Sequence, residues 1–288
     1  MPQTINTTLN SLNAQRSLGS SQMSLATSMQ RLSSGLRVNS AKDDAAGLAI
    51  AERMTSQVRG MNVSIRNAND GISMSQTAEG ALGKVADSLQ RMRELSVQAA
   101  NATNSSSDKD SLDKEFGELS KEIQRVLGGT SFNGQHMLGT DAKAFTFQVG
   151  ANTTSNDTID ITTTDLTADA TITAVAGTDN TGAARALIDS TASASTIQGV
   201  INSIDTALNT VNAQRAVLGA SQSRFDAVVS NLQTSIENQT AARSRIVDTD
   251  FAAETARLSR AQILQQAGNA MVAQANQLPQ QVTTLLRG

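Results

Sequence analysis

Residues 47–92 read GLAIAERMTSQVRGMNVSIRNANDGISMSQTAEGALGKVADSLQRM, and this stretch decides the fold. Apolar or small residues recur in it at alternating spacings of four and three, which matches one face of an α-helix. The positions are Gly47, Ala51, Met54, Val58, Met61, Ile65, Ala68, Ile72 and Ser75 and, after a local shift, Ala78, Leu82, Val85, Leu89 and Met92. A seven-residue repeat held this long predicts a coiled-coil or bundle seam on a helix roughly 75–80 Å long.

A second helix is expected after the first. The polar, serine-rich residues 101–110 should form the turn between them. The next residues keep the four-three spacing at Leu112, Phe116, Leu119, Ile123 and Val126. Gly128 and Gly129 then predict the end of this second helix.

The period changes between residues 130 and 194. Phe145, Phe147 and Val149 alternate with polar residues, as do Ile159 and Ile161. Two alternating runs around a polar loop predict a β-hairpin. Ile172 and Val175 suggest one more weak strand in the threonine-rich part that follows, and residues 179–182 predict a turn.

The last region, 195–288, is predicted to be helical again. The three-four spacing runs through Ile201, Ile204, Leu208, Val211, Arg215, Leu218, Gln222, Phe225, Val229, Leu232 and Ile236. The pattern blurs at residues 243–250, which predicts a break, and continues weakly afterwards. No proline lies between Pro2 and Pro279, which allows very long helices in this part of the chain.

These patterns predict a mainly α protein: a long antiparallel helical bundle or coiled-coil rod, a small β-hairpin region, and paired N- and C-terminal helices. We expect residues 1–45 with 249–288 to form the terminal-helix domain. Residues 46–178 with 190–248 should form the bundle and hairpin, and 179–189 a short variable turn. The terminal helices have few partners within one chain, and the first region carries little apolar surface. We therefore expect both termini to be loose in the monomer and ordered only by contact with other copies.

Composition excludes several classes of function. The chain has 288 residues, a formal net charge of −3, no Cys, no Trp, no Tyr and one His. Near-balanced charge argues against a nucleic-acid binder, and no apolar run is long enough to cross a membrane. A bundle enzyme or metal carrier would need Glu-x-x-His on two helices, which a single His136 in a glycine-flanked loop does not supply. We therefore predict no enzyme activity, no cofactor and no metal.

The paired carboxylates Asp43–Asp44 and Asp248–Asp250 have no nucleophile or metal partner, so helix capping or ion pairs between subunits is expected of them. Residues 1–20 show no secretory signal with an apolar core. The residues alone would therefore predict a cytoplasmic protein.

Several motifs resemble the terminal signatures of bacterial flagellins. QRLSSGLR (30–37) with VNSAKDDAAG (38–47) and RNANDGI (66–72) with QTAEGAL (76–82) match the N-terminal signature. SFNG (131–134) and FQVGAN (147–152) match the family's turn and hairpin. DTDFAAE (248–254) and QANQ (274–277) match the C-terminal signature. The matches cover more than four fifths of the chain and fall in the family's order.

The resemblance implies a structural subunit of the flagellar filament, a hollow homopolymer in which terminal helices form an inner tube and the bundle an outer tube. It also implies export through a type III apparatus without a cleaved signal peptide, and so an extracellular location. Implied partners are many identical subunits, the export apparatus, a chaperone, and the hook-junction and cap proteins. The signature residues implied in assembly are Arg31, Leu32, Gly35, Arg37, Asn39, Asp43, Asp44, Asn67, Asn69, Asp70 and Phe251.

A further implication is recognition of the monomer by Toll-like receptor 5. LQRMREL (89–95) resembles the stretch that this receptor contacts, and Arg91, Leu95 and Glu115 fall on matching positions. Arg91 and Leu95 are four residues apart, which puts them on one face of a helix. The alternative is that this face only packs against neighbouring subunits.

Two other structural roles stay open at this point: a hook-filament junction protein, which shares the terminal helices, and a secreted helical adaptor. The threonine-rich segment 153–181 could also carry O-linked sugar on the surface of a filament.

Overall fold

The computed structural model describes residues 9–285, with side chains described up to residue 277. It divides into two compact units. The terminal unit holds the described residues up to Ser56 and from Glu237, and the central unit holds Gln57–Ile236. This division falls within two long helices, whereas the boundaries expected at 45 and 249 fall close to helix ends. The assignment of 1–45 with 249–288 to one filament layer and of the bundle to another stays a prediction.

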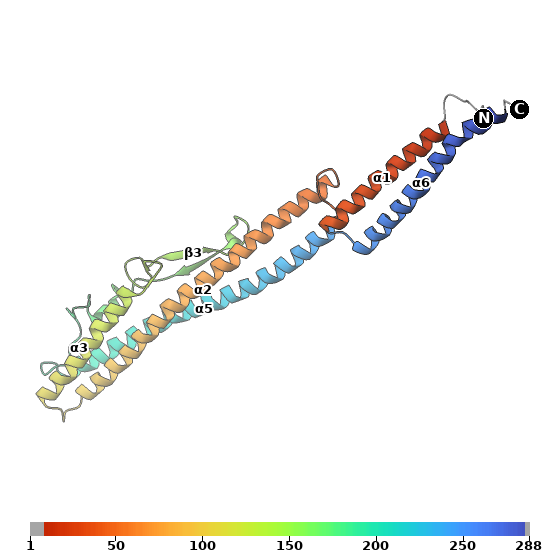
Figure 1. The fold of residues 1–288 in the computed structure, drawn as a ribbon. Helices are drawn as coiled ribbons and strands as arrows, with labels where there is room; N and C mark the ends of the chain where they lie inside the picture. Colours follow the sequence, from red (N-terminus) through yellow and green to blue (C-terminus); the bar gives the residue numbers. More distant parts are fainter. Residues whose placement is uncertain (1–8, 286–288) are drawn as a thin grey trace. The chain divides into compact units, whose positions relative to one another are not determined.

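Six helices and four short strands make up the described chain (Figure 1). The helices are α1 (Leu9–Ser34), α2 (Ala45–Ala99), α3 (Ser106–Gly129), α4 (Ala170–Ala176), α5 (Ala194–Val247) and α6 (Phe251–Leu285). The strands are β1 (Ser131–Phe132), β2 (Gln135–His136), β3 (Ala144–Gln148) and β4 (Thr158–Thr162). A 3-10 turn, Ser155–Asp157, precedes β4. The mainly α fold with a small hairpin region is confirmed, and none of the described helices has an apolar stretch sufficient to span a membrane.

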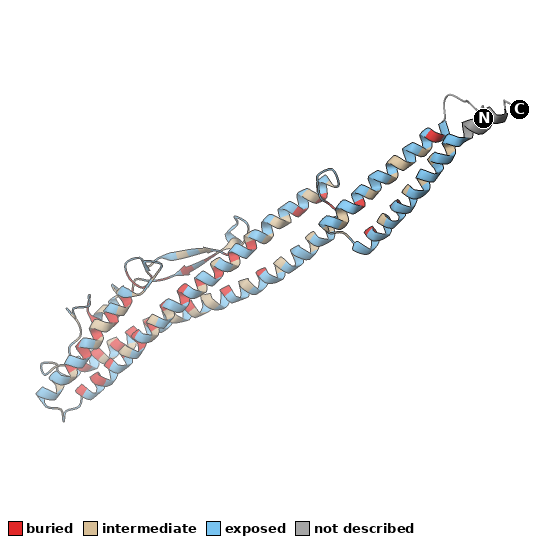
Figure 2. Ribbon diagram, in the orientation of Figure 1, coloured by how far each residue is buried: buried red, intermediate tan, exposed pale blue. Residues whose placement is uncertain are grey.

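The core of the central unit is the apolar seam between α2 and α5. The predicted seam positions Ala68, Ala78, Leu82, Leu89 and Met92 are fully or almost fully buried. On α5 the buried apolar positions of this unit are Ile197, Val200, Ile204, Ala207, Val211, Leu218, Phe225 and Leu232. Burial in this unit follows the facing sides of the long helices, while their outer sides stay exposed (Figure 2).

α3 forms the third helix of the bundle. It buries Phe116, Ile123 and Leu127 against the same core. Its start is fixed by a capping box, in which Ser105 and Asp108 each accept a hydrogen bond from the other's backbone N–H. Three helices therefore share one core, as the heptad spacing predicted.

Two antiparallel hairpins follow α3. In the larger one β3 pairs with β4, with Phe145 opposite Ile161 and Phe147 opposite Ile159, as the alternation predicted. The smaller one pairs β1 with β2. Asn133 (φ 51°) and Gly134 (φ 79°) connect these two strands, and positive φ at both turn positions is the type I′ geometry that Asn-Gly favours.

The weak strand expected around Ile172 and Val175 is wrong, because these residues lie on the short helix α4. Asp169 caps this helix by accepting a hydrogen bond from the Thr171 N–H. A spacing of three residues places Ile172 and Val175 on one helical face, and both are fully buried. The turn expected at 179–182 is present, with the Thr181 N–H donating to Asp179 Oδ1 at 2.9 Å.

A buried ion pair holds the segment after α4 onto α3. Arg185 donates to both carboxylate oxygens of Asp113, at 2.9 and 2.5 Å, and its guanidinium lies 5.9 Å from the centre of the Phe116 ring. Asp113 also accepts the Ile188 N–H at 3.0 Å. Both charged side chains are nearly buried, so each compensates the other's desolvation.

We predict that Arg185→Met lowers the free energy of unfolding by about 3 kcal/mol, because it leaves the Asp113 carboxylate buried without its cation. Urea unfolding followed by circular dichroism would measure this change. Arg185→Met with Asp113→Leu should recover part of the loss. Equal stability of the single variant and the wild type would contradict the buried pair.

Candidate functional site

The terminal helices α1 and α6 pack against each other within the terminal unit. Their contact buries mainly small or polar residues: Ser11 and Ser28 on α1, and Glu254 and Ala261 on α6. Large apolar side chains of the pair remain exposed, namely Leu9, Leu12, Met23, Met29, Phe251, Ile263, Leu264 and Met271. The pair therefore carries more exposed large apolar side chains than buried ones.

α1 and α6 lie close together, but in the described residues few hydrogen bonds join them. Ser11 Oγ donates a hydrogen bond to Asn276 Oδ1 at 2.8 Å. Gly268 lets Leu18 approach α6, since a Cβ at this glycine would lie 3.2 Å from Leu18 Cδ1. The single chain thus already forms a pair of terminal helices, and the looseness expected of these helices in the monomer stays a prediction. Their ordering by other copies stays a prediction.

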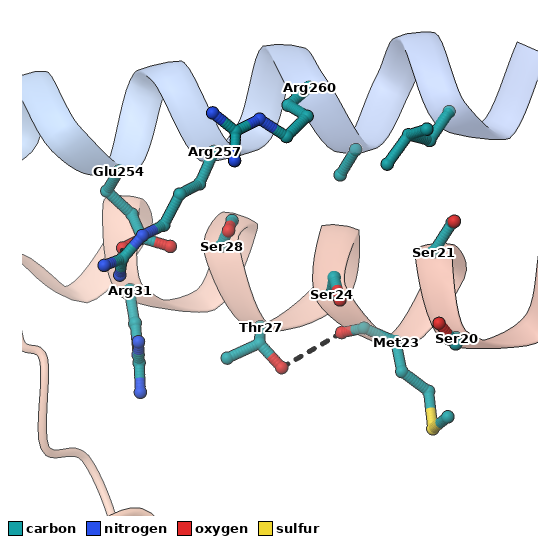
Figure 3. A pocket seen from close by; sticks show the side chains of 12 residues that line it. Ser20, Ser21, Met23, Ser24, Thr27, Ser28, Arg31, Glu254, Arg257 and Arg260 are labelled. Atoms are coloured by element: carbon teal, nitrogen blue, oxygen red, sulfur yellow. Dashed lines mark hydrogen bonds and ion pairs between the residues drawn. The ribbon is translucent and has the colours of Figure 1, made fainter.

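An open groove of about 600 Å³ runs between the two helices. Serines of α1 line it, and Figure 3 shows Ser21 and Ser28 turned toward α6. The Glu254 carboxylate is almost fully buried and is paired with Arg257 at 3.1 Å. The groove holds no nucleophile with a base, and the described residues contain no cluster of His, Cys, Asp or Glu that could hold a metal ion.

The residues just after α1 are bound to the end of α5. Gly35 ends α1 in a left-handed conformation (φ 72°), and its carbonyl accepts the Thr249 N–H at 2.9 Å. The Arg37 N–H donates to the Val247 carbonyl at 2.6 Å, and its guanidinium donates to the Ile246 carbonyl at 2.6 Å. Two of the signature residues, Gly35 and Arg37, therefore join the turn after α1 to the turn after α5.

Two of the acidic signature residues, Asp43 and Asp44, accept hydrogen bonds from backbone N–H groups. Asp43 accepts hydrogen bonds from the N–H groups of Ser40 (2.9 Å) and Asn39 (3.2 Å). These bonds, the Ser40 one foremost, hold the pKa of Asp43 below its ordinary value. Asp44 accepts the Gly47 N–H at 2.8 Å at the start of α2. A Cβ at Gly47 would overlap that carboxylate, which explains the glycine.

Asp250 caps α6 in the same way, by accepting the N–H groups of Ala252 (2.9 Å) and Ala253 (3.1 Å). The capping expected of the paired carboxylates therefore holds for Asp44 and Asp250. Asp248 contributes through its backbone instead, as the bridge partner of Leu36.

The other signature residues do not gather in one place. Asn67 donates from its side chain to the Gln148 carbonyl at 2.9 Å and so ties β3 to α2. Asn69 bonds within its own helix, to the Ile65 carbonyl. Asp70 is exposed and makes no side-chain hydrogen bond to any residue that the structure describes. Arg31 and Leu32 are half-buried on α1, and Phe251 is exposed beside Gly35.

The residues with the expected receptor role lie on α2 and α3. Arg91 Nε donates to Glu115 Oε1 at 2.8 Å, and Arg91 Nη1 donates to Glu94 Oε2 at 2.9 Å. These two carboxylates, Glu115 first, raise the pKa of Arg91 above its ordinary value. The side chains of Arg91 and Glu115 are exposed, whereas Leu95 is fully buried in the core. Leu95 is therefore not accessible to a partner at the surface of the folded monomer. The receptor role of the three residues stays a prediction.

Some features gave no signal in the sequence. The Arg185–Asp113 pair joins residues 72 positions apart, and the Arg93–Asp205 pair (2.7 Å) joins residues 112 apart. His136 lies in β2, and its backbone N–H donates to Asp141. A periodicity analysis finds the faces of helices but not which charged residues meet across them.

Two family models match most of the chain. The model described as the bacterial flagellin N-terminal helical region matches residues 5–142, and that of the C-terminal helical region matches residues 201–286. The chain belongs to the bacterial flagellin family. This flagellin is therefore a structural protein of the flagellar filament and not an enzyme, and it polymerises with identical subunits.

Full-length relatives agree with the family models. This flagellin is 45% identical to a flagellin of Halalkalibacterium halodurans, over 98% of this chain and 99% of the relative. It is 41% identical to a flagellin of Bacillus subtilis, over the same shares of the two chains. A solved structure from Vibrio parahaemolyticus, assigned to a putative flagellar hook-associated protein, matches with a TM-score of 0.60. It covers 72% of this chain and 100% of its own at 16% identity, which shows a shared fold alone.

We predict a pH-dependent loosening of the turn that Asp43 closes. Its pKa is lowered in the folded chain, so its stabilising effect is complete above the ordinary value of about 3.8 and is lost as the pH falls through the folded pKa. Amide exchange at Asn39 and Ser40 should accelerate as the pH is lowered through that range, after correction for intrinsic rates. The Asp43→Asn variant should lack this transition, and a transition of the same size in the variant would contradict the assignment.

Proposed function

We propose that this flagellin polymerises through the α1–α6 pair and that the pair completes its ordering only against neighbouring copies. The observation that carries the proposal is the set of eight large apolar side chains that the pair leaves exposed. Apolar surface of this kind is typical of protein interfaces. The serine- and alanine-lined contact of α1 with α6 offsets little of the entropy of ordering both helices.

Truncation tests the role of the ends. A fragment of residues 46–246 retains the α2–α5 seam, α3 and both hairpins, so it should keep a helical spectrum and a cooperative thermal transition. Without α1 and α6 it should not elongate filament seeds in an electron-microscopy assay. Filaments grown from the fragment would contradict the proposal.

A point variant in the full chain makes the same test without truncation. Ile263→Ser with Leu264→Ser removes two exposed apolar side chains of α6, whose loss should leave the monomer folded and slow seeded growth at least tenfold. Leu187→Ser removes an apolar side chain of similar exposure outside the pair and serves as the control. Equal growth of both variants would place the assembly contacts elsewhere.

The proposal extends to the partners of the unassembled chain. A chain that leaves its apolar ends uncovered needs a chaperone before export, and export of a filament subunit needs the flagellar apparatus and a cap at the growing tip. We place the export signal in the N-terminal segment and expect that it is not cleaved. Residues 1–8 of this segment lie outside the described residues. The signatures at both ends and the match along the whole chain favour a filament subunit over a hook-filament junction protein or an adaptor.

A second proposed function is recognition of the monomer by Toll-like receptor 5 through Arg91 and Glu115. Supporting it are the exposure of both side chains and their fixed geometry, in which one guanidinium bridges two carboxylates on α2 and α3. The filament-contact alternative uses the same exposed face.

We predict that Arg91→Ala reduces receptor activation by the monomer at least tenfold in a reporter-cell assay. Its thermal unfolding transition should stay close to that of the wild type, because exposed ion pairs contribute little to stability. Lys84→Ala removes another exposed pair of the same helix, with Asp87, and should leave activation unchanged. Full activation by Arg91→Ala together with impaired filament growth would favour the filament-contact role instead.

A further inference from the structure

Phe225 of α5 lies in a notch on α2 that Gly71 creates. A Cβ built on Gly71 would lie 2.8 Å from Phe225 Cζ and 3.1 and 3.2 Å from its two Cε atoms. Both residues are buried, and Phe225 is fully so. Glycine in a helix interior is unfavourable, and its presence here is explained by the ring that occupies the space of its side chain.

Two ion pairs at other positions along the helices are consistent with the same antiparallel alignment of α2 with α5. Arg93 pairs with Asp205 at 2.7 Å, and Glu79 pairs with Arg215 at 3.4 Å. The apolar seam itself repeats every seven residues, so a slip of one heptad would still bring apolar layers opposite apolar layers. The seam therefore drives pairing but discriminates weakly between registers.

The notch and its neighbouring polar residues penalise such a slip. Displaced by seven residues, Phe225 would meet Ser64 or Ala78, which carry the Cβ that Gly71 lacks. Arg215 would leave Glu79 and face Ile72 or Ala86, although its Nε is already buried without a hydrogen bond to any described residue. An unpaired cation against apolar side chains is costly.

The same ring also positions the hairpin. Phe147 of β3 meets Phe225 edge to face, with ring centroids 5.6 Å apart and planes at 84°. Two further contacts place the hairpin on α2. The Asn67 side chain donates to the Gln148 carbonyl, and Ala151 lies so close to Gly60 that a Cβ built on Gly60 would lie 2.9 Å from the Ala151 Cβ. Movement of α5 would carry Phe225 away from Phe147, so this side chain couples the register of α5 to the position of the hairpin.

We propose that Phe225 in the Gly71 notch is a register lock: it selects one alignment of α5 on α2 and seats the β3–β4 hairpin in the matching position. The seam drives the helices together, and the lock makes their alignment unique. Because the lock lies within the central unit, its failure would leave the proposed role of α1 and α6 untouched.

Spin labels in the full-length chain test this directly, because the chain has no native cysteine. Gln90→Cys on α2 and Ser223→Cys on α5 are exposed label sites. Ser223 lies next to the notch, whereas Gln90 lies about 28 Å along α2 from Gly71. Sliding of one helix along the other therefore changes the distance between the two labels.

With the native notch, pulsed electron resonance should give one distance between the labels. Gly71→Ala should add a second population, as expected when α5 moves by one heptad, about 10 Å along α2. It should also lower Tm by about 5 °C or more, because the added methyl group overlaps the ring of Phe225.

Gly80→Ala is the matched control, since its added methyl group meets no atom within 4 Å. It should keep the single distance and hold or raise Tm. Gly71→Ala with Phe225→Leu removes the overlap and should recover Tm relative to Gly71→Ala alone. If Gly71→Ala does not fold, the label distance in Phe225→Leu tests the lock instead, because loss of the ring should likewise broaden the distance distribution. A single, unchanged distance in the folded Gly71→Ala protein, or in Phe225→Leu, would overturn the lock.

Discussion

Burial of the apolar seam between α2 and α5 is the contact on which the central unit depends. Each long helix exposes a narrow stripe of Leu, Ile, Val, Met and Ala, and neither stripe can stay in water at low cost. Once the two stripes pair, α3 closes the third side, and the hairpins and α4 cover what remains. The absence of Trp and Tyr is consistent with this arrangement, since mainly aliphatic side chains fill the seam between the helices.

The terminal helix pair, in contrast to the central unit, leaves most of its large apolar side chains exposed. This pair buries serines, an alanine and an ion-paired glutamate, and it displays Leu, Ile and Met side chains outward. Order at its base comes instead from hydrogen bonds: Gly35, Arg37, Asp43, Asp44 and Asp250 fix the two turns where the chain changes direction. Hydrogen-bonded turns combined with a helix pair that leaves apolar side chains exposed are consistent with a subunit whose neighbours cover those side chains.

Periodicity predicted the parts of this structure that follow from local pattern. The heptad repeats identified α2, α3 and α5, and strict alternation identified β3 and β4, because each pattern reflects which face of one element is buried. The same reasoning misassigned α4 as a weak strand, although the three-residue spacing of Ile172 and Val175 fits a helix and Asp169 caps its start. It also put Arg91 and Leu95 on one accessible face, although Leu95 points into the core. The Arg185–Asp113 pair and the Gly71 notch depend on contacts between distant segments, which no local pattern encodes.

Hydrogen exchange measured on the monomer and on seed-grown filaments would show whether α1 and α6 acquire their protection from neighbouring copies. Amides of the α2–α5 seam should be protected in both states. Those of α1 and α6 should exchange quickly in the monomer and become protected in the filament. Strong and equal protection of α1 and α6 in the monomer would contradict this dependence on neighbouring copies, because the terminal pair would then be stable on its own contacts.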